Sequence, residues 1–214
     1  MILDAILKNK LVAILRGVSP DQLIPLLEAL YEGGVRLAEI TFDAKGITPA
    51  EVTAQQIAAA AKHFEGRMHI GAGTVLTVKQ AQLAIDSGAK FMISPNVDEA
   101  VIRYTKERGV ISMPGAFTPT ESVNAVNMGA DFVKIFPSDT MGPKYFKAIC
   151  APLSHIKFIA VGGVDHNNVG DFLKAGAVGV GVGSNIVNKE MLKKGDYAGI
   201  TSLAKLYVEA IEKV

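Results

Sequence analysis

Short apolar runs alternate with longer amphipathic segments along this chain. The short runs are rich in β-branched or aromatic residues and usually end at Gly or Pro, whereas the longer segments repeat apolar residues at the period of an α-helix. The pattern predicts strands at residues 11–15, 37–42, 68–71, 91–94, 110–113, 132–136, 157–161 and 178–181. It predicts helices between them at 20–32, 49–64, 78–87, 98–108, 119–128, 144–151 and 168–175, with two more near 3–8 and 197–214.

Eight strands that alternate with helices predict an α/β fold of the (β/α)8 barrel type, also called a TIM barrel. The strand centres lie about 20 to 30 residues apart, the pitch of a repeated βα unit. A doubly wound open sheet also alternates strands and helices, and the strand count disfavours it. The helix near residues 3–8 is placed to close the bottom of the barrel. No linker or shift in composition divides the chain, so we expect one domain over residues 1–214.

Lys134 stands out because it lies in an otherwise apolar predicted strand. Side chains alternate along a strand, so Lys134 shares a face with Phe132 and Phe136, and Val133 and Ile135 point the other way. Burial lowers the pKa of an ammonium and makes the amine a nucleophile for carbonyl groups. A lysine whose stem reaches solvent at the strand end, or one neutralised by a structural carboxylate, explains this strand equally well.

Chemically useful residues fall at the ends of successive predicted strands, where barrel enzymes carry their active sites. Glu39 lies within the second strand and shares a face with Thr41, which predicts that it points into the barrel. A carboxylate there is either a structural partner of Lys134 or a group that moves protons. The seventh and eighth strands end in Gly162-Gly163 and Gly183-Ser184, a pair of loops that often binds phosphate in barrels. The alternative is that these glycines only make tight turns.

Composition excludes several classes of function. The chain has 49% hydrophobic residues and a formal net charge of +1, with charges of both signs scattered, so no basic stripe predicts binding to nucleic acid or a membrane surface. No apolar run approaches a membrane span, and the first residues lack the pattern of a signal peptide. Cys150 is the only cysteine, so no internal disulfide forms, and we expect a cytoplasmic location. The four histidines do not have the spacing of metal ligands, so we expect no metal and no cofactor.

These residues together resemble one family, the bacterial class I aldolases that act on 2-keto-3-deoxy-6-phosphogluconate (KDPG), its galactonate epimer, or 4-hydroxy-2-oxoglutarate. The resemblance covers nearly the whole chain. It is carried by the motifs Ala13-Ile14-Leu15-Arg16-Gly17, Glu39-Ile40-Thr41, Gly71-Ala72-Gly73-Thr74-Val75-Leu76, Ser94-Pro95, Pro114-Gly115, Val133-Lys134-Ile135-Phe136-Pro137, Gly162-Gly163 and Gly183-Ser184.

The resemblance implies a Schiff-base lyase that releases pyruvate and glyceraldehyde 3-phosphate, or pyruvate and glyoxylate from 4-hydroxy-2-oxoglutarate. Lys134 would form the Schiff base and Glu39 would move protons, whereas Thr74 and an arginine would hold the substrate carboxylate. It also implies a homotrimer whose partners are a phosphorylated keto acid and pyruvate. The expected substrate-binding residues are Arg16, Thr74, Pro95, Phe136, Val161, Gly162, Gly163, Gly183 and Ser184.

Two positions depart from the gluconate-type pattern. Those relatives commonly carry an arginine where this chain has the segment Phe42-Asp43-Ala44, which leaves Arg16 as the candidate cation. Gluconate-type relatives also tend to carry threonine at the position of Val161. Galactonate-type members carry valine there, as this chain does. Both departures tilt the expected substrate towards the galactonate epimer or relaxed specificity. A phosphate-binding barrel that senses a sugar phosphate without chemistry is the alternative function.

Overall fold

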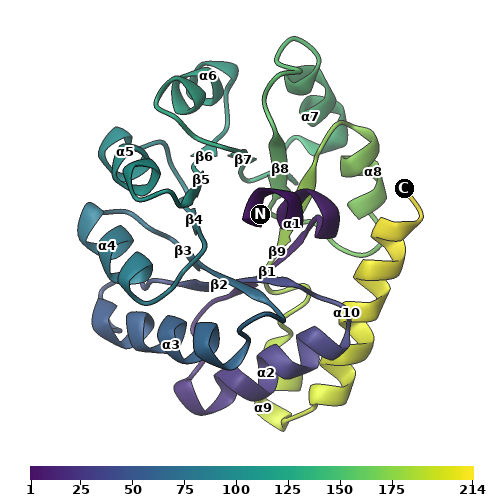
Figure 1. Ribbon diagram of the computed structural model, residues 1–214. Coiled ribbons are helices and arrows are strands. Elements are labelled where there is room, and N and C mark those ends of the chain that lie inside the picture. The colour runs from purple at the N-terminus through teal and green to yellow at the C-terminus, as the bar shows by residue number, and fades with distance from the viewer.

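Nine parallel strands form one sheet that curves into a barrel, and the computed structural model describes residues 1–214 (Figure 1). The hydrogen-bonded order is β5-β4-β3-β2-β1-β9-β8-β7-β6. The strands are β1 Leu11–Leu15, β2 Leu37–Thr41, β3 His69–Gly73, β4 Phe91–Ile93, β5 Ile111–Met113, β6 Gly115–Ala116, β7 Val133–Ile135, β8 Phe158–Val161 and β9 Gly179–Val182. The helices are α1 Ile2–Asn9, α2 Pro20–Glu32, α3 Ala50–His63, α4 Val78–Asp86, α5 Glu99–Glu107, α6 Pro119–Asn127, α7 Gly142–Cys150, α8 Val169–Lys174, α9 Lys189–Lys194 and α10 Tyr197–Glu212.

The ninth strand arises because extended backbone continues past the fifth predicted strand, which ends at residue 113, and Pro114 separates β5 from β6. Proline has no N–H to donate to a ladder. The segment that contains β5 and β6 nevertheless forms backbone hydrogen bonds with β7 and the residues before it. The carbonyl of Ser112 accepts the N–H groups of Asp131 and Phe132 at 3.0 and 3.3 Å, and the carbonyl of Pro114 accepts the N–H group of Lys134 at 2.9 Å. The ring of eight βα units is therefore closed, and the (β/α)8 barrel predicted from the sequence is confirmed.

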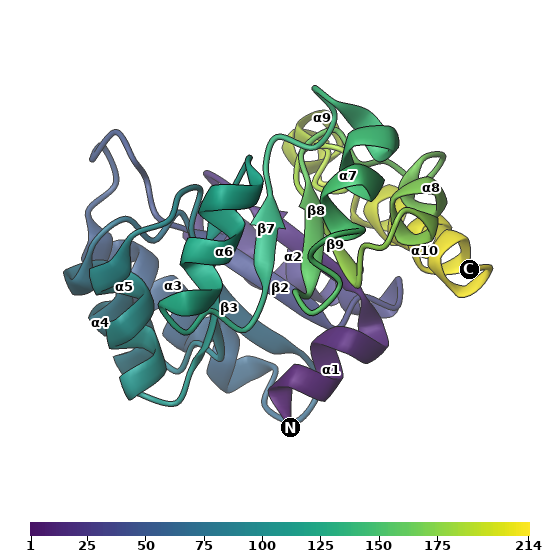
Figure 2. The ribbon, with the colours of Figure 1, turned by 90° about the horizontal axis from the view of Figure 1, so that it is seen from above.

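Alternation along the strands separates two apolar cores. Residues that point outward pack against the surrounding helices, whereas the barrel interior is filled by eleven buried residues: Ile6, Val12, Ile14, Leu37, Phe91, Ile93, Ile111, Met113, Phe132, Ile159 and Val161. Ile6 comes from α1, which lies across one end of the barrel, while α9 lies at the other end (Figure 2). The predicted closure of the barrel bottom by the first helix is confirmed.

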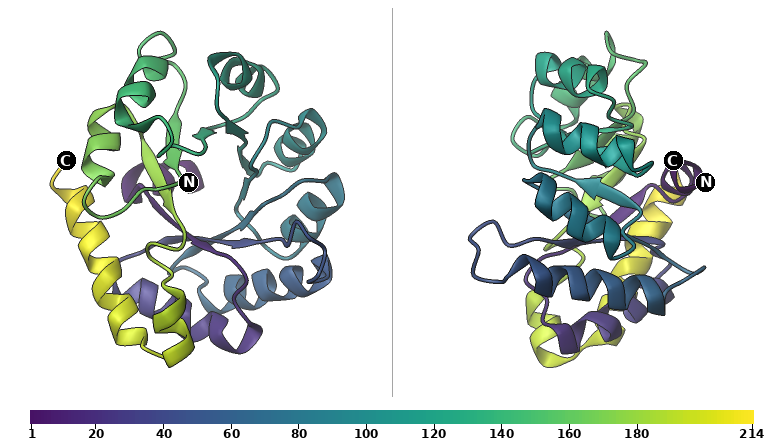
Figure 3. Two further views of the ribbon diagram at one scale, coloured as in Figure 1. Left: turned by 180° about the vertical axis from the view of Figure 1, so that it is seen from behind. Right: turned by 60° about the vertical axis from the view of Figure 1, so that its left-hand side comes forward.

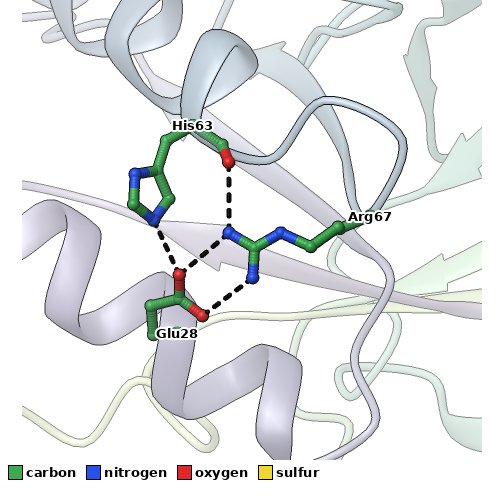
Figure 4. Close-up of polar contacts among 3 residues, drawn as sticks. All are labelled: Glu28, His63 and Arg67. Atoms are coloured by element: carbon green, nitrogen blue, oxygen red, sulfur yellow. Dashed lines mark hydrogen bonds and ion pairs between the residues drawn. The ribbon is translucent and has the colours of Figure 1, made fainter.

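The outer helices pack against one another around the barrel. The last helix, α10, packs against α2 and α8, which joins the end of the chain to its beginning (Figure 3). Glu28 on α2 accepts hydrogen bonds from Arg67 at 3.0 and 3.3 Å and lies 2.6 Å from Nε2 of His63, which ties α2 to the end of α3 (Figure 4). None of the helices is long and apolar enough to span a membrane.

The structure moves some predicted boundaries. The third strand, expected at 68–71, extends to Gly73, because its backbone pairs with Thr41 of β2 although glycine favours strands poorly. The sixth, expected at 132–136, is limited to three residues in β7. Helix α9 was not predicted. Only six residues long, it is too short to repeat an apolar face, and only Leu192 of its side chains is buried.

Candidate active site

Lys134 lies inside the barrel. Its strand β7 is held between β6 and β8, with Lys134 opposite Gly115 on one side and Ile159 on the other. The residue is 7% exposed, and its Nζ lies 4.7 Å from the centre of the Phe136 ring. Burial is the main cause that lowers the pKa of the Lys134 ammonium; the carboxyl of Glu39 acts to raise it and the guanidinium of Arg16 to lower it further. The side chain does not reach bulk solvent, so the first alternative from the sequence does not hold.

Glu39 shares the barrel interior with Lys134 but does not form an ion pair with it. The residue is 2% exposed, and its Oε2 is buried without a hydrogen-bond partner. Burial raises the pKa of the Glu39 carboxyl to about 7, although the charges of Lys134 and Arg16 act to lower it. Near neutral pH the group is therefore divided between its acid and base forms, which is the condition for general acid–base catalysis.

A cavity of about 450 Å³ opens at the end of β7, β8 and β9, and we call it the lysine cavity. Lys134 lies in its wall together with Arg16, and the wall also includes Phe136 and Val161. The wall contains eight of the eleven residues predicted from the sequence: Arg16, Lys134, Phe136, Val161, Gly162, Gly163, Gly183 and Ser184. Glu39, Thr74 and Pro95 do not line it.

The glycines in the lysine cavity have different physical reasons to be glycine. Gly162 and Gly163 adopt φ values of +98° and +67°, a region that side chains disfavour, and a Cβ on Gly163 would overlap Asp139. Glycine is therefore required at these two positions by the backbone conformation of the turn. Gly183 has no such constraint, since its φ is outside the left-handed region and a Cβ would come no closer than 3.8 Å to Ile14. Its missing side chain leaves the backbone open to the cavity.

Val161 fills the barrel beneath the glycine loops. Its side chain belongs to the interior core, and a Cβ on the neighbouring Gly181 would lie only 2.9 Å from it. Valine at this position therefore gives the lysine cavity an apolar wall beside Lys134, where a hydroxyl-bearing residue would offer a hydrogen bond.

A second cavity of about 480 Å³, which we call the side cavity, lies between the loops that follow β1 and β2. Arg16 and Gly17 line both cavities, and the side cavity is also lined by Thr41 and Thr74. Thr74 has a φ of +55°, which a β-branched residue rarely adopts, so its place is dictated by the surrounding fold. The candidate carboxylate ligands Arg16 and Thr74 are thus on one side of the site and the glycine loops on the other.

Asp43 does not replace an arginine in function. Its carboxylate accepts the backbone N–H groups of Lys45, Ile47 and Thr48 at 2.9, 2.9 and 3.0 Å. These hydrogen bonds lower the pKa of the Asp43 carboxyl. The residue therefore organises the loop after β2 while it lines the side cavity.

Pro95 is placed away from both cavities. Its carbonyl oxygen lies against Gly115, and a Cβ on that glycine would overlap the carbonyl. The contact joins the end of β4 to β6 next to the strand of Lys134. Pro95 therefore lines neither cavity, and its part in substrate binding stays a prediction.

Ser138 is a buried residue near the site that the sequence did not reveal. Its hydroxyl donates to the carbonyl of Ile135 at 2.8 Å and accepts the N–H of Val161 at 3.1 Å. Its own N–H donates to the carbonyl of Val161 at 2.8 Å. These bonds fix the end of β7 against the end of β8, and a serine in a loop after a proline gives no signal of such a role.

Two lysines on α9 were also missed. Lys189 and Lys193 line the lysine cavity and are four residues apart, so they lie on one face of the helix. The helix is held by Asn188, which accepts two N–H groups of its first turn, and by Gln22, whose Nε2 donates to the carbonyl of Leu192 at 3.2 Å. Besides Lys134, the 19 residues that line the cavity include three cations, Arg16, Lys189 and Lys193, and no carboxylate. An anionic ligand is the natural occupant.

The arrangement has the parts for imine chemistry on an anionic keto compound. A buried amine can attack a carbonyl, a buried carboxyl near its pKa can move protons, and cations with an open glycine backbone can hold an anionic end. No group of three or more His, Cys, Asp or Glu side chains is placed to hold a metal ion.

Comparison with known proteins gives a consistent set of matches. The profile of the family described as "Aldolase: KDPG and KHG aldolase" matches residues 2–203. A probable 2-dehydro-3-deoxy-6-phosphogalactonate aldolase of Rhizobium meliloti (strain 1021) is 38% identical over 186 residues, which are 86% of this chain and 85% of that protein.

Solved structures agree with this match. A structure described as native KDPGal is 33% identical, with a TM-score of 0.85 over 95% of this chain and 94% of its own. A KDPG aldolase of Legionella pneumophila, in which pyruvate was captured as a covalent carbinolamine, is 28% identical, with a TM-score of 0.85 over 95% of this chain and 96% of its own.

Proposed function

The chain belongs to the family of KDPG and KHG aldolases, and on that premise we propose that Lys134 is its Schiff-base residue. The reaction is the cleavage of a 2-keto-3-deoxy-6-phospho sugar acid to pyruvate and glyceraldehyde 3-phosphate. One observation carries the proposal: a lysine with a lowered pKa is buried in the wall of a cavity that has cations and no carboxylate. A structural lysine needs no such cavity.

Carbon–nitrogen bond formation opens the proposed reaction. The neutral amine of Lys134 attacks the keto carbon of the substrate and gives a carbinolamine. Glu39 in its acid form donates a proton to the departing hydroxyl, which leaves as water, and the iminium forms. After this step Glu39 is a carboxylate and the nitrogen of Lys134 carries the positive charge.

Carbon–carbon cleavage follows from this charge distribution. The Glu39 carboxylate takes the proton of the hydroxyl on C4, the bond between C3 and C4 breaks, and its electron pair moves into the iminium to give an enamine. Glyceraldehyde 3-phosphate leaves. Glu39 returns its proton to C3, which gives a new iminium. Water hydrolyses this iminium to pyruvate and the free amine, and the proton that is released restores the acid form of Glu39. The iminium is the electron sink, so the steps as proposed use no metal.

Substrate binding follows the division of the site. Arg16 and Thr74 take the carboxylate end, and Gly162, Gly163, Gly183 and Ser184 take the phosphate end through backbone N–H groups, with Phe136 and Val161 as walls. Pro95 acts through Gly115, the neighbour of Lys134 in the sheet. The apolar wall at Val161 and the absence of a second arginine at Asp43 favour the galactonate epimer, as does the name of the Rhizobium relative. Cleavage of 4-hydroxy-2-oxoglutarate to pyruvate and glyoxylate is the minor activity we expect, since it lacks the phosphate.

A substrate panel tests the proposal. The gluconate and galactonate epimers, each with and without the 6-phosphate, are supplied with lactate dehydrogenase and NADH, and pyruvate release is read as loss of absorbance. We expect release from the phosphorylated compounds, faster with the galactonate epimer. Thermal stabilisation by these compounds without pyruvate release would overturn the proposal in favour of a binding protein.

We further propose a homotrimer of one-domain chains in the cytoplasm. The family resemblance supports the trimer, and a single cysteine suits a reducing compartment. Light scattering of the purified protein measures the number of 22.6 kDa chains directly. A monomer that is fully active would contradict the trimer.

A further inference from the structure

Two buried polar atoms without hydrogen-bond partners lie on one face of β2. They are Oε2 of Glu39 and Oγ1 of Thr41, and the only other such side-chain atom is the hydroxyl of Tyr207, on the outer helix α10. Buried polar groups in folded proteins are nearly always paired, so an unpaired one calls for an explanation. Two of them, two residues apart on one strand face, call for a joint explanation.

The two side chains converge on Gly73 of the neighbouring strand. A Cβ placed on Gly73 would lie 2.7 Å from Oε1 of Glu39 and 2.8 Å from Cγ2 of Thr41. Gly73 thus makes room for both groups at one point in the barrel wall. Oγ1 and Cγ2 of threonine occupy two of the three staggered positions about the Cα–Cβ bond. One rotamer change therefore moves the hydroxyl to the position of the methyl group, on the side of Gly73 that the Glu39 carboxyl also approaches.

We infer that Thr41 is a positioning residue whose hydroxyl hydrogen-bonds the Glu39 carboxyl in both of its protonation states. A hydroxyl donates to a carboxylate and accepts from a carboxylic acid, which neither an ammonium nor a backbone N–H group does. Glu39 alternates between these two forms in the proposed reaction, so a partner that serves both keeps the carboxyl in place through the cycle. The inference rests on the proposed function and adds a residue to it.

The charges around Glu39 do not already fill this role. Lys134 on β7 and Arg16 after β1 are the charged groups that act on it, and both favour only the ionised form. The strands on either side contribute no further ionisable group at this level, since β1 faces Glu39 with Ile14 and β3 with Gly71 and Gly73. Loss of the hydroxyl removes a charge-assisted hydrogen bond and shifts the Glu39 pKa upward.

Thr41→Val and Thr41→Ser separate the hydroxyl from the packing. Valine keeps the shape and removes the hydroxyl, whereas serine keeps the hydroxyl and removes a methyl group. For Thr41→Val we expect kcat to fall by roughly tenfold or more, the acid limb of the pH–rate profile to move up by about one unit, and KM to change little. Thr41→Ser should retain most of the turnover and the wild-type limb.

Wild-type kcat and an unshifted pH–rate profile in folded Thr41→Val would overturn the inference and leave Thr41 as a packing residue. If the valine variant does not fold, Thr41→Ala compared with Thr41→Ser poses the same question. Borohydride trapping of pyruvate on Lys134 keeps the two proposals apart. If the wild type forms the adduct and Thr41→Val behaves like the wild type, only the role of Thr41 is contradicted. If the wild type forms no adduct, the proposed function itself is contradicted.

Discussion

Replacing Gly183 by alanine should damage recognition of the phosphate without damaging the fold. The added Cβ meets no protein atom closer than 3.8 Å, so the protein tolerates it, and Gly183 lies in the wall of the lysine cavity. A phosphate that accepts a backbone N–H needs an N···O distance of about 2.9 Å, and a methyl group in its path prevents that approach.

The magnitude follows from the hydrogen bonds lost. One hydrogen bond to a charged group contributes about 1.5–3 kcal/mol, which corresponds to roughly 10- to 150-fold in affinity. We therefore expect kcat/KM for the phosphorylated substrate to fall by about that factor. The unphosphorylated analogue should react as with the wild type, and the free energy of unfolding should be unchanged or slightly raised, since alanine loses less chain entropy than glycine.

The assay is pyruvate release from the phosphorylated and unphosphorylated forms of one epimer, with urea unfolding as the measure of stability. Gly170→Ala on α8 is the matched control, because it makes the same chemical change in a helix outside the lysine cavity, where the nearest atom to the new Cβ is Cγ2 of Val214 at 3.4 Å. Equal losses on both forms of the substrate, or no loss on either, would refute the assignment of this backbone to phosphate.

Three further changes test other parts of the account. Glu39→Gln should lower kcat by about 10²- to 10⁴-fold and abolish the acid limb near pH 7, with adduct formation at Lys134 partly intact; wild-type turnover would remove Glu39 from the proton path. The double variant Lys189→Gln, Lys193→Gln should raise KM for the phosphorylated substrate by roughly 3- to 10-fold at low salt, and the increase should fade at high salt. Lys194→Gln, on the same helix but outside the cavity, is the control and should leave KM unchanged. A change in kcat would contradict a purely electrostatic role. Glu28→Gln should cost up to about 1 kcal/mol of unfolding free energy after solvent screening. Arg67 and His63 lower the Glu28 pKa below its ordinary 4.5, so the contribution of Glu28 to stability is fully present above about pH 4.5 and is lost as the pH falls through the lowered pKa. A variant that loses as much unfolding free energy well below that pKa as at neutral pH, measured by urea unfolding, would contradict this explanation.

The sequence predicts the interior position of Lys134 and Glu39 because strand alternation and burial are local properties. An apolar strand buried on both faces leaves a charged residue no solvent-exposed side, so either orientation of Lys134 would have marked it as unusual. The order of the strand ends then predicts which residues share one end of the barrel, and the lysine cavity brings eight of them together.

Other features depend on contacts between distant segments. The lysines of α9 line the cavity, and Gln22 of α2 anchors that helix, whereas Pro95 lines neither cavity and its carbonyl packs on Gly115. Asp43 looks in sequence like an altered wall of the site, whereas its hydrogen bonds are with its own loop. The approach of Thr41 and Glu39 to one point depends on the missing side chain of Gly73, a relation that no local pattern expresses.

The central claim is that Lys134 forms an imine with pyruvate. Incubation with pyruvate, reduction with borohydride and peptide mass mapping test it directly, with Lys134→Gln as the control. We predict one stable adduct of pyruvate mass less the lost oxygen, on Lys134 alone, and none in the variant. An unmodified Lys134, or an adduct on another lysine, would contradict the account.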